Sequence, residues 1–460
     1  MNDTVLRGGT VWQDERGMVN ADVVIADGRI TEIASSGTGQ AANIVDVTGL
    51  TVLPGAIDAH IHLGHGTDIS RPRVPIDAIT ETGAAARGGV TSLIPYILSA
   101  EPYTDVFEEI VAVTESGARI DFGFHFVIAT EAQLAEVAML CQKGSPTAKL
   151  FMNIRGDEGK RLGLPGTNDG FLFRLLERLA QNGGMLCPHP ENIEVAWVLR
   201  DRVMAQPEAE RDTLAAWNAT RPPFVEAEAL SRAAYFGRVT GTPVHGVHTS
   251  SGEALAAAVQ QRAAGSDVSI ETCIQYLTQD TDSDIGAMGK VNPPLRAPTD
   301  RDALWAGIDS GQIDTIATDH IHRPRSSKDG GIWAAQPGFP GLDTFLPALL
   351  TEARKRDIGL EKVLPLVSRN PARRMGFTNK GHLAAGMDAD IAVLDLNASF
   401  TVDNADLATD AGYSTLHGQT MTAKTVHTMS RGNFVLRDGA LTDTSIGQGR
   451  YVARTLGQVE

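Results

Sequence analysis

Cysteine is scarce in this sequence. The 460 residues contain three, Cys141, Cys187 and Cys273, and none of them forms a CxxC pair. A disulfide framework needs paired cysteines and an oxidising compartment, so an odd and scattered set indicates a reducing one. We therefore predict a cytoplasmic protein without structural disulfides.

Basic charge and long apolar runs are also lacking. Lys and Arg total 40 against 56 Asp and Glu, which gives a net charge of −16. This balance argues against nucleic acid or an anionic membrane as the main partner. No apolar run approaches the roughly 18 residues of a membrane span, and the opening MNDTVLRGGTVW lacks the layout of a signal peptide. Hydrophobic residues still make up 42% of the chain, enough for a sizeable core.

Both ends of the chain are rich in β-forming residues. Residues 3–52 carry short alternating runs, and ADIAVLDLNASFTV and AKTVHTMSRGNFVLRDGALT repeat this pattern near the other end. The ADGR and RDGA segments between such runs are hairpin signals, because Asp-Gly suits a tight β-turn. We expect one small β-sandwich domain built from residues 1–53 and 376–460.

The middle of the chain, residues 54–375, alternates between apolar strand-like runs and amphipathic helical segments. Alternation of this kind over a long stretch is typical of parallel β/α units. No GxGxxG follows the first strand, so the main support for a dinucleotide-binding fold is missing. The sequence predicts an α/β protein whose catalytic domain is a (β/α)8 TIM-like barrel.

Polar residues at the ends of these apolar runs indicate a site. His60 and His62 stand two residues apart after TVLPGAIDA, and positions i and i+2 of a strand share a face. Lys149 lies inside the apolar run TAKLFM, and further candidates end other runs, namely His189, His245, His248 and Asp319. Catalytic groups of a barrel lie at the carboxyl ends of its strands. Each residue alone has an ordinary structural explanation, and together they predict a metal site.

Several motifs resemble those of the metal-dependent amidohydrolase superfamily, in particular its cyclic amidohydrolases, which include hydantoinase, dihydropyrimidinase, allantoinase and dihydroorotase. LPGAIDAHIHL resembles the first metal motif, TAKLFM the lysine strand, and HPEN the third-histidine motif. VHTSSGEAL, ETCIQYLT, NPPLR, ATDH, QPGFPGLDT and GMDADIAVLD follow in the family's order, so the resemblance covers almost the whole chain.

The resemblance implies a centre with two divalent metal ions held by six side chains. His60, His62 and Asp319 would bind the more buried ion, His189 and His248 the other, and Lys149, carboxylated to N6-carboxylysine, would bridge them. Zn2+ is the implied metal, and Mn2+, Co2+ or Fe2+ are compatible with these ligands. His245 matches no ligand position of the family and is interpreted as structural.

The implied reaction is hydrolytic opening of a small cyclic amide of the hydantoin, dihydropyrimidine or cyclic imide type. A metal-bound hydroxide would attack the ring carbonyl, and Asp319 would move the proton to the leaving nitrogen. The family also implies a homo-oligomer, a tetramer or a dimer.

The substrate pocket departs from the family pattern. Where hydantoinases carry a tyrosine five residues after the lysine, this chain has Ile154, flanked by Asn153 and Arg155. Gly64 stands in place of the arginine with which dihydroorotases bind a carboxylate, and Pro337 stands in place of a hydantoinase asparagine. The metal motifs therefore match better than the motifs that select the substrate.

Two further residues complete the expected pocket. Asn292 in NPPLR fits the substrate-contact position, and its amide offers both a donor and an acceptor. His65 either faces the substrate or is an ordinary loop histidine. With Gly64 and Ile154, these residues predict a neutral substrate, unless Arg155 turns inward and restores anion binding.

Two other functions remain open at this point. One is a different reaction on the same centre, either hydrolysis of a linear N-acyl or carbamoyl substrate or a decarboxylation. The other is a non-catalytic scaffold related to dihydropyrimidinase, which is disfavoured because all six ligand positions are filled.

Overall fold

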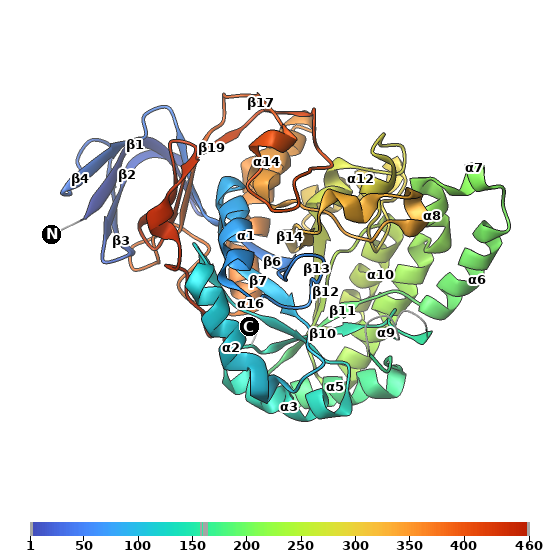
Figure 1. Ribbon diagram of the computed structural model, residues 1–460. Helices are drawn as coiled ribbons and strands as arrows, with labels where there is room; N and C mark the ends of the chain where they lie inside the picture. The colour runs from blue at the N-terminus through green and yellow to red at the C-terminus, as the bar shows by residue number, and fades with distance from the viewer. Residues whose placement is uncertain (1–2, 157–158, 160–163, 458–460) are drawn as a thin grey trace.

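The structure is a computed structural model that describes residues 3–156, 159 and 164–457. Strands from both ends of the chain form one nine-stranded sheet in the order β21-β20-β19-β16-β5-β1-β2-β3, with β4 beside β1. In Figure 1 the blue N-terminal strands and the red β19 lie together at one end of the molecule. The strands are β1 (Thr4–Gln13), β2 (Gly17–Ala26), β3 (Arg29–Ser35), β4 (Asn43–Asp46), β5 (Thr51–Pro54), β16 (Ile391–Asp395), β19 (Lys424–Ser430), β20 (Asn433–Arg437) and β21 (Ala440–Leu441).

Two tight turns in this sheet explain its hairpins. Asp27 and Gly28 join β2 to β3 with φ values of 52° and 76°, and Asp438 and Gly439 join β20 to β21 with φ values of 51° and 79°. Consecutive positive φ values match the right-handed twist of the flanking strands. Both hairpins predicted from Asp-Gly are therefore confirmed.

The middle of the chain forms a parallel barrel. Its strands follow the order β14-β13-β12-β11-β10-β9-β7-β6-β15, and β8 also pairs with β7. These are β6 (Ala56–His62), β7 (Val90–Ile97), β8 (Asp121–Phe122), β9 (His125–Val127), β10 (Thr147–Phe151), β11 (Met185–His189), β12 (Val244–Gly246), β13 (Val268–Cys273), β14 (Thr315–Ala317) and β15 (His320–Ile321). The short pairs β8/β9 and β14/β15 each fill one place in the ring, so the barrel has eight strand positions and the predicted fold class is confirmed.

The barrel is closed by an interrupted strand. β14 pairs with β13, whereas β15 pairs with the first barrel strand, β6, and only Thr318 and Asp319 separate the two pieces. The last strand position therefore changes partner at Asp319. This residue belongs at once to the seam of the barrel and to the candidate site.

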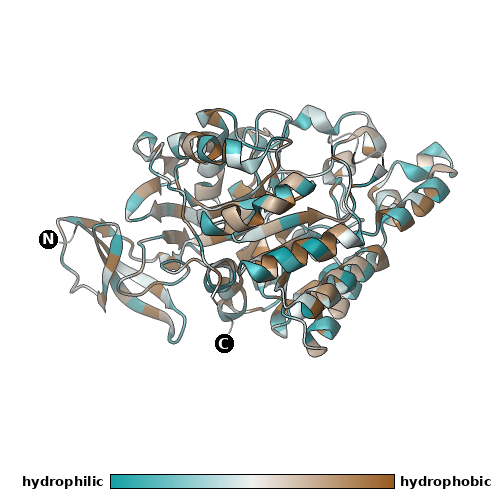
Figure 2. Cartoon of the chain, turned by 90° about the horizontal axis from the view of Figure 1, so that it is seen from below, coloured by the Kyte–Doolittle hydropathy of each residue, from teal (hydrophilic) through white to brown (hydrophobic). Residues whose placement is uncertain are grey.

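Helices surround the barrel (Figure 1). In Figure 2 hydrophilic and hydrophobic residues alternate along them, as expected for helices with one face on a core. They are α1 (Pro75–Arg87), α2 (Tyr103–Gly117), α3 (Glu131–Gln142), α5 (Asp169–Gln181), α6 (Ile193–Met204), α7 (Glu208–Arg211), α8 (Leu214–Thr220), α9 (Pro223–Thr240), α10 (Gly252–Ala263), α11 (Ile274–Thr278), α12 (Pro298–Asp309), α13 (Gly331–Ala334), α14 (Phe345–Lys355), α15 (Leu360–Val367) and α16 (Arg369–Met375). In the described part of the chain, none of these is both long and apolar enough to cross a membrane.

The segments after α16 contact both parts of the molecule. A small two-stranded sheet, β17 (Phe400–Thr401) with β18 (Thr420–Met421), precedes β19. The C-terminal segment returns to the barrel, where the buried guanidinium of Arg454 donates to the carbonyls of Phe124 and Met375. The expected division at residues 53/54 and 375/376 stays a prediction.

Candidate metal centre and active site

The six side chains predicted as metal ligands line one cavity of about 260 Å3 at the carboxyl ends of the barrel strands. They are His60 and His62 at the end of β6, Lys149 on β10, His189 at the end of β11, His248 after β12, and Asp319 between β14 and β15. Parallel strands end at the same rim, which explains how residues far apart in sequence meet here.

His60, His62 and Asp319 form the first group. Oδ1 of Asp319 lies 3.2 Å from Nε2 of His60 and 3.5 Å from Nε2 of His62. The three side chains offer ligand atoms that all lie within 4.8 Å of one another. Two imidazole nitrogens and a carboxylate oxygen at one point are a donor set that suits Zn2+ and similar ions.

His189 and His248 form the second group. Nδ1 of His189 lies 2.8 Å from Nε2 of His248, so the two rings turn nitrogen atoms toward one another. Burial holds the pKa of His248 well below its ordinary value, and the neighbouring His189 adds to this effect. The ring of His60 lies 5.2 Å from that of His248, which places the two groups side by side.

Lys149 lies in the same cavity and is buried. Its Nζ sits 4.3 Å from the centre of the Tyr96 ring. Burial lowers the pKa of the Lys149 ammonium to about 8, although the Asp319 carboxylate acts in the opposite direction. A lysine of this kind has an accessible neutral amine, which is the form that can react with carbon dioxide.

The backbone is strained at two of these residues. Asp319 has a φ of 49° and His248 a φ of 40°, values that non-glycine residues rarely adopt. Such a conformation costs about 1–3 kcal/mol for each residue and persists where the surroundings impose it, often at functional sites. The strain thus supports a functional role for this rim of the barrel.

Glu271, on β13, holds the first histidine group from behind. Its fully buried carboxylate accepts hydrogen bonds from Nδ1 of His60 at 2.7 Å, from Nε2 of His245 at 3.1 Å, and from the backbone N–H of His248 at 3.1 Å. The bond to Nδ1 leaves Nε2 of His60 as the lone-pair atom facing Asp319. Nδ1 of His245, interpreted as structural, accepts from the hydroxyl of Ser269 at 2.7 Å, so His245 supports the site through Glu271.

Glu191 and Asp58 orient two of the other candidate ligands. Oε2 of Glu191 accepts from Nε2 of His189 at 2.8 Å, which leaves Nδ1 of that ring facing His248. Asp58 accepts from the hydroxyl of Thr318 at 2.5 Å and from its backbone N–H at 3.2 Å, directly before Asp319. Burial raises the pKa of Asp58 to about 7.

Sequence reasoning missed these three carboxylates. A charged residue inside the apolar run VSIETC was the available signal for Glu271, because a buried glutamate is rare unless it is paired.

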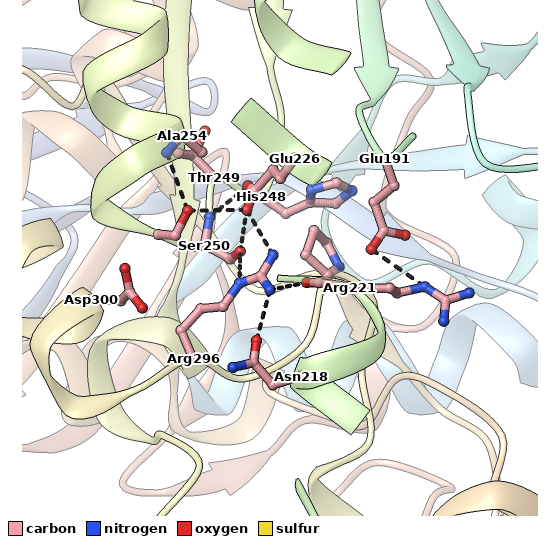
Figure 3. A network of polar contacts seen from close by, with 12 residues as sticks. Glu191, Asn218, Arg221, Glu226, His248, Thr249, Ser250, Ala254, Arg296 and Asp300 are labelled. Atoms are coloured by element: carbon pink, nitrogen blue, oxygen red, sulfur yellow. Dashed lines mark hydrogen bonds and ion pairs between the residues drawn. The ribbon is translucent and has the colours of Figure 1, made fainter. Parts of the chain in front are cut away.

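A buried ion pair supports the loop after His248. The guanidinium of Arg296 lies 3.0 Å from Glu226 and donates to Oγ of Ser250 at 2.9 Å and to Asn218 at 2.8 Å (Figure 3). Glu226 in turn accepts from the backbone N–H of Ser250 at 2.8 Å. Because Ser250 follows His248 by two residues, this network fixes the backbone that carries this candidate ligand.

The remainder of the cavity has an apolar wall and a polar rim. The apolar wall includes Leu98, Val127, Phe151 and Ile154. Arg323 also lines the cavity, and its guanidinium donates to the carbonyls of Thr67 at 3.3 Å and Pro337 at 2.8 Å. Sequence reasoning placed Ile154 here but missed Arg323, which ties two rim loops together.

Asn292 lines the cavity, as the sequence suggested. Its Oδ1 accepts a hydrogen bond from Nε1 of Trp217 at 3.2 Å, and the same indole N–H also reaches the carbonyl of Val291 at 3.1 Å. An indole nitrogen can only donate, so the amide oxygen is the atom that faces Trp217. The amide nitrogen is therefore the polar end left for the cavity.

Gly64 and His65 are not among the described residues that line the cavity. Gly64 is packed against the following turn, and a Cβ atom there would lie 2.0 Å from the carbonyl oxygen of Asp68. The arginine of the dihydroorotase pattern cannot occupy this position without rebuilding the turn. His65 is more than half exposed, and its Nδ1 lies 2.9 Å from a carboxylate oxygen of Asp77.

Arg155 is also absent from the cavity lining among the described residues. Its guanidinium donates to the carbonyl of Thr167 at 2.6 Å and to Glu194 at 3.1 Å. The structure thus does not place Arg155 where it would restore anion binding. Its neighbours Asn153 and Ile154 are the residues of this segment that reach the cavity.

A closed parallel barrel with histidines, a lysine and an aspartate gathered at its carboxyl rim defines a class of barrel hydrolase whose site could hold metal ions. Comparison with known proteins agrees with this class. Residues 212–435 match the profile described as "Amidohydrolase family". An allantoinase of Solibacter usitatus (strain Ellin6076) is 32% identical over 455 residues, which cover 97% of this chain and 96% of that protein. A D-hydantoinase of Streptomyces coelicolor is 30% identical over 472 residues, with 98% of each chain covered.

Solved structures give the same result. The crystal structure of dihydropyrimidinase from Brevibacillus agri NCHU1002 has a TM-score of 0.89 and 28% identity, and the match covers 100% of both chains. This chain belongs to the amidohydrolase family, and its similarity extends over its whole length to the allantoinases and hydantoinases.

Proposed function

We propose that this protein, a cyclic amide hydrolase, opens the ring of a small neutral amide of the hydantoin, dihydropyrimidine or cyclic imide type. The observation that carries the proposal is the convergence of six ligand-type side chains in one cavity of about 260 Å3. The volume suits a small molecule, and the cavity combines apolar walls with a few polar groups, as ligand sites usually do.

The proposed centre holds two divalent ions, with Zn2+ as the metal. His60, His62 and Asp319 would hold one ion, His189 and His248 the other, and Lys149, as N6-carboxylysine, would join the two. The donor set fits, since four imidazoles and the carboxylate of Asp319 converge from two adjoining groups. When bound, such ions supply a water that reacts near neutral pH and positive charge for a carbonyl oxygen.

Asp319 is the proposed proton carrier. Its Oδ1 lies closest to the two imidazoles of β6, so Oδ2 is the atom proposed to take the proton of the attacking water. The water oxygen bonds to the ring carbonyl carbon, the carbon–nitrogen bond breaks, and Asp319 returns the proton to the leaving nitrogen. The product is one open-chain molecule, with an amide or ureide nitrogen that carries the transferred hydrogen and a new carboxylic acid that releases the second proton of the water to solvent and becomes a carboxylate.

The polar and apolar walls support a neutral substrate. Ile154 offers an apolar surface, and Asn292 offers an amide N–H to a ring carbonyl. Arg323, the cation at the rim, uses its guanidinium to hold the carbonyls of Thr67 and Pro337. We therefore expect neutral ring amides to be better substrates than dihydroorotate, which carries a carboxylate.

The experiment is a ring-opening assay with allantoin, hydantoin, dihydrouracil and dihydroorotate at equal concentration, compared by kcat/KM and accompanied by elemental analysis. The expected result is two divalent ions per chain and the highest kcat/KM for a neutral ring. Asp319→Asn serves as the control with strongly reduced turnover. A fully metal-loaded protein that opens none of these rings would refute the proposed reaction, and a preference for dihydroorotate would refute the neutral pocket.

We also propose a cytoplasmic homo-oligomer, a tetramer or a dimer. Exposed apolar side chains on α6 and α9 support an association surface, and these are Val198, Met204, Phe224, Tyr235 and Val239. The three free cysteines, two of them buried, are compatible with a reducing compartment. Sedimentation equilibrium of the purified protein tests the oligomer.

A further inference from the structure

Asn153 carries a buried polar atom without a partner. The residue follows β10, is 6% exposed, and lines the cavity beside Ile154. Its Nδ2 donates to Oε2 of Glu191 at 3.3 Å. Its Oδ1 is buried and has no hydrogen-bond partner among the residues that the structure describes. Most buried oxygens of this kind are satisfied, so an exception calls for an explanation.

The orientation of the Asn153 amide follows from its neighbour. Oε2 of Glu191 already accepts from Nε2 of His189 at 2.8 Å, and Oε1 of Glu191 lies 3.5 Å from Nε of Arg221 (Figure 3). A flipped amide would set the oxygen of Asn153 against a carboxylate oxygen, an arrangement of two acceptors. Nδ2 must therefore face Glu191, and Oδ1 is the end available to a molecule in the cavity.

The amide of Asn292 has the opposite orientation. Its oxygen accepts from the indole N–H of Trp217, so its nitrogen is the end left for the cavity. The cavity thus offers an acceptor at Asn153 and a donor at Asn292. A ring amide or ureide has the complementary pair, an N–H and a C=O.

We propose that Asn153 determines specificity by accepting a hydrogen bond at Oδ1 from an N–H of the substrate, on the side of the cavity where His189 lies. The inference rests on the proposed function and narrows its substrate class to cyclic amides and ureides in which this nitrogen is unsubstituted. Replacing that hydrogen by a methyl group removes the donor and sets an apolar group against a buried oxygen.

Asn153 also touches Glu191, which orients His189, so a purely structural role must be separated from substrate binding. Two readouts do this. Metal content shows whether Glu191 still orients His189. The ratio of kcat/KM between a parent substrate and its N-methyl derivative reports on the N–H contact alone.

The experiment measures kcat/KM for hydantoin, 1-methylhydantoin, 3-methylhydantoin, dihydrouracil and 1-methyldihydrouracil, together with metal content. The variants are Asn153→Ala, Asn153→Ser, whose side chain is too short for the contact, and the control Asn182→Ala, at an asparagine that caps α5 and is not among the described residues that line the cavity. The wild type is expected to discriminate against one N-methyl position. In Asn153→Ala and Asn153→Ser, kcat/KM for the parent should fall about 2- to 13-fold, the range of one neutral hydrogen bond. The discrimination should fall with it, at unchanged metal content.

Asn182→Ala is expected to keep the N-methyl discrimination of the wild type. The inference is overturned if Asn153→Ala and Asn153→Ser discriminate as strongly as the wild type, or if they lose metal and all activities in equal proportion. A wild-type enzyme that opens parent and methylated rings equally well also overturns it while leaving ring opening intact. A wild-type enzyme that opens none of these rings overturns the proposed function itself, and the inference with it.

Discussion

Replacing Glu271 by glutamine tests how the first histidine group is held. The buried carboxylate of Glu271 accepts from His60 at 2.7 Å, from His245 at 3.1 Å and from the backbone of His248 at 3.1 Å. Glutamine has the same shape but only one accepting atom. If the glutamine oxygen faces His60 and His248, the glutamine nitrogen faces Nε2 of His245. The ring of His245 must then carry its proton on Nδ1, which donates to the hydroxyl of Ser269.

This rearrangement keeps the hydrogen bonds and removes the negative charge behind His60. Loss of a carboxylate in this position weakens metal binding by about 10- to 100-fold, which corresponds to about 1.4–2.7 kcal/mol. We expect Glu271→Gln to lose Zn2+ affinity within this range, because the substitution keeps the geometry of His60 but lowers the basicity of its imidazole. The assay is a Zn2+ titration against a competing chelator, with the circular dichroism spectrum recorded to confirm folding.

Glu136→Gln is the matched control. Glu136 is another buried carboxylate that accepts backbone hydrogen bonds, from Tyr103 at 2.9 Å and Thr104 at 2.8 Å, at the start of α2. The Glu136→Gln substitution is expected to lower the thermal stability of the protein and leave its Zn2+ affinity unchanged. Equal Zn2+ affinities for Glu271→Gln and the wild type would refute the idea that Glu271 tunes His60.

Three further predictions follow from the same geometry. Lys149→Ala should bind fewer than two metal ions by elemental analysis, and native mass spectrometry of the wild type should show the carboxyl adduct; a metal-loaded wild type with an unmodified lysine contradicts this. Asp319→Asn should lose at least about 100-fold in kcat while keeping much of its metal, and unchanged turnover would exclude it as the proton carrier. Lys380→Met should destabilise the protein by about 3–5 kcal/mol in urea unfolding, because the buried Lys380 ammonium lies 2.5 Å from Asp390 and 2.8 Å from Asp121; a loss below 1 kcal/mol would contradict this.

The sequence predicts the barrel and its rim well because both depend on local pattern. The candidate ligands other than Lys149 end apolar runs, and parallel strands bring such ends to the same side. The hairpins at Asp27 and Asp438 were equally readable, since the turn type is set by two adjacent residues. These features need no knowledge of which strands become neighbours.

The residues that orient the candidate ligands are harder to predict from the sequence, because their partners are distant in the sequence. Glu271 meets His60 across a separation of 211 residues, and only the closed barrel sets that pairing. The free oxygen of Asn153 depends in the same way on Glu191, 38 residues further along the chain. The contacts of loop residues are the hardest to predict from the sequence, as His65 shows. The ring of His65 lies within hydrogen-bond distance of Asp77 at the start of α1, and nothing in the HLGHG pattern specifies that contact.

The position of β5 has a consequence for biosynthesis. This strand lies inside the terminal sheet, between β1 and β16, yet β16 begins only at Ile391. At roughly 5–20 residues per second, a ribosome needs roughly 20–70 s to make the intervening chain. Throughout that interval one edge of β5 has no partner, and an open strand edge can pair with another nascent chain. The completion of this sheet is therefore a late step of biosynthesis, and rapid overproduction should favour aggregation through the N-terminal strands rather than through the barrel.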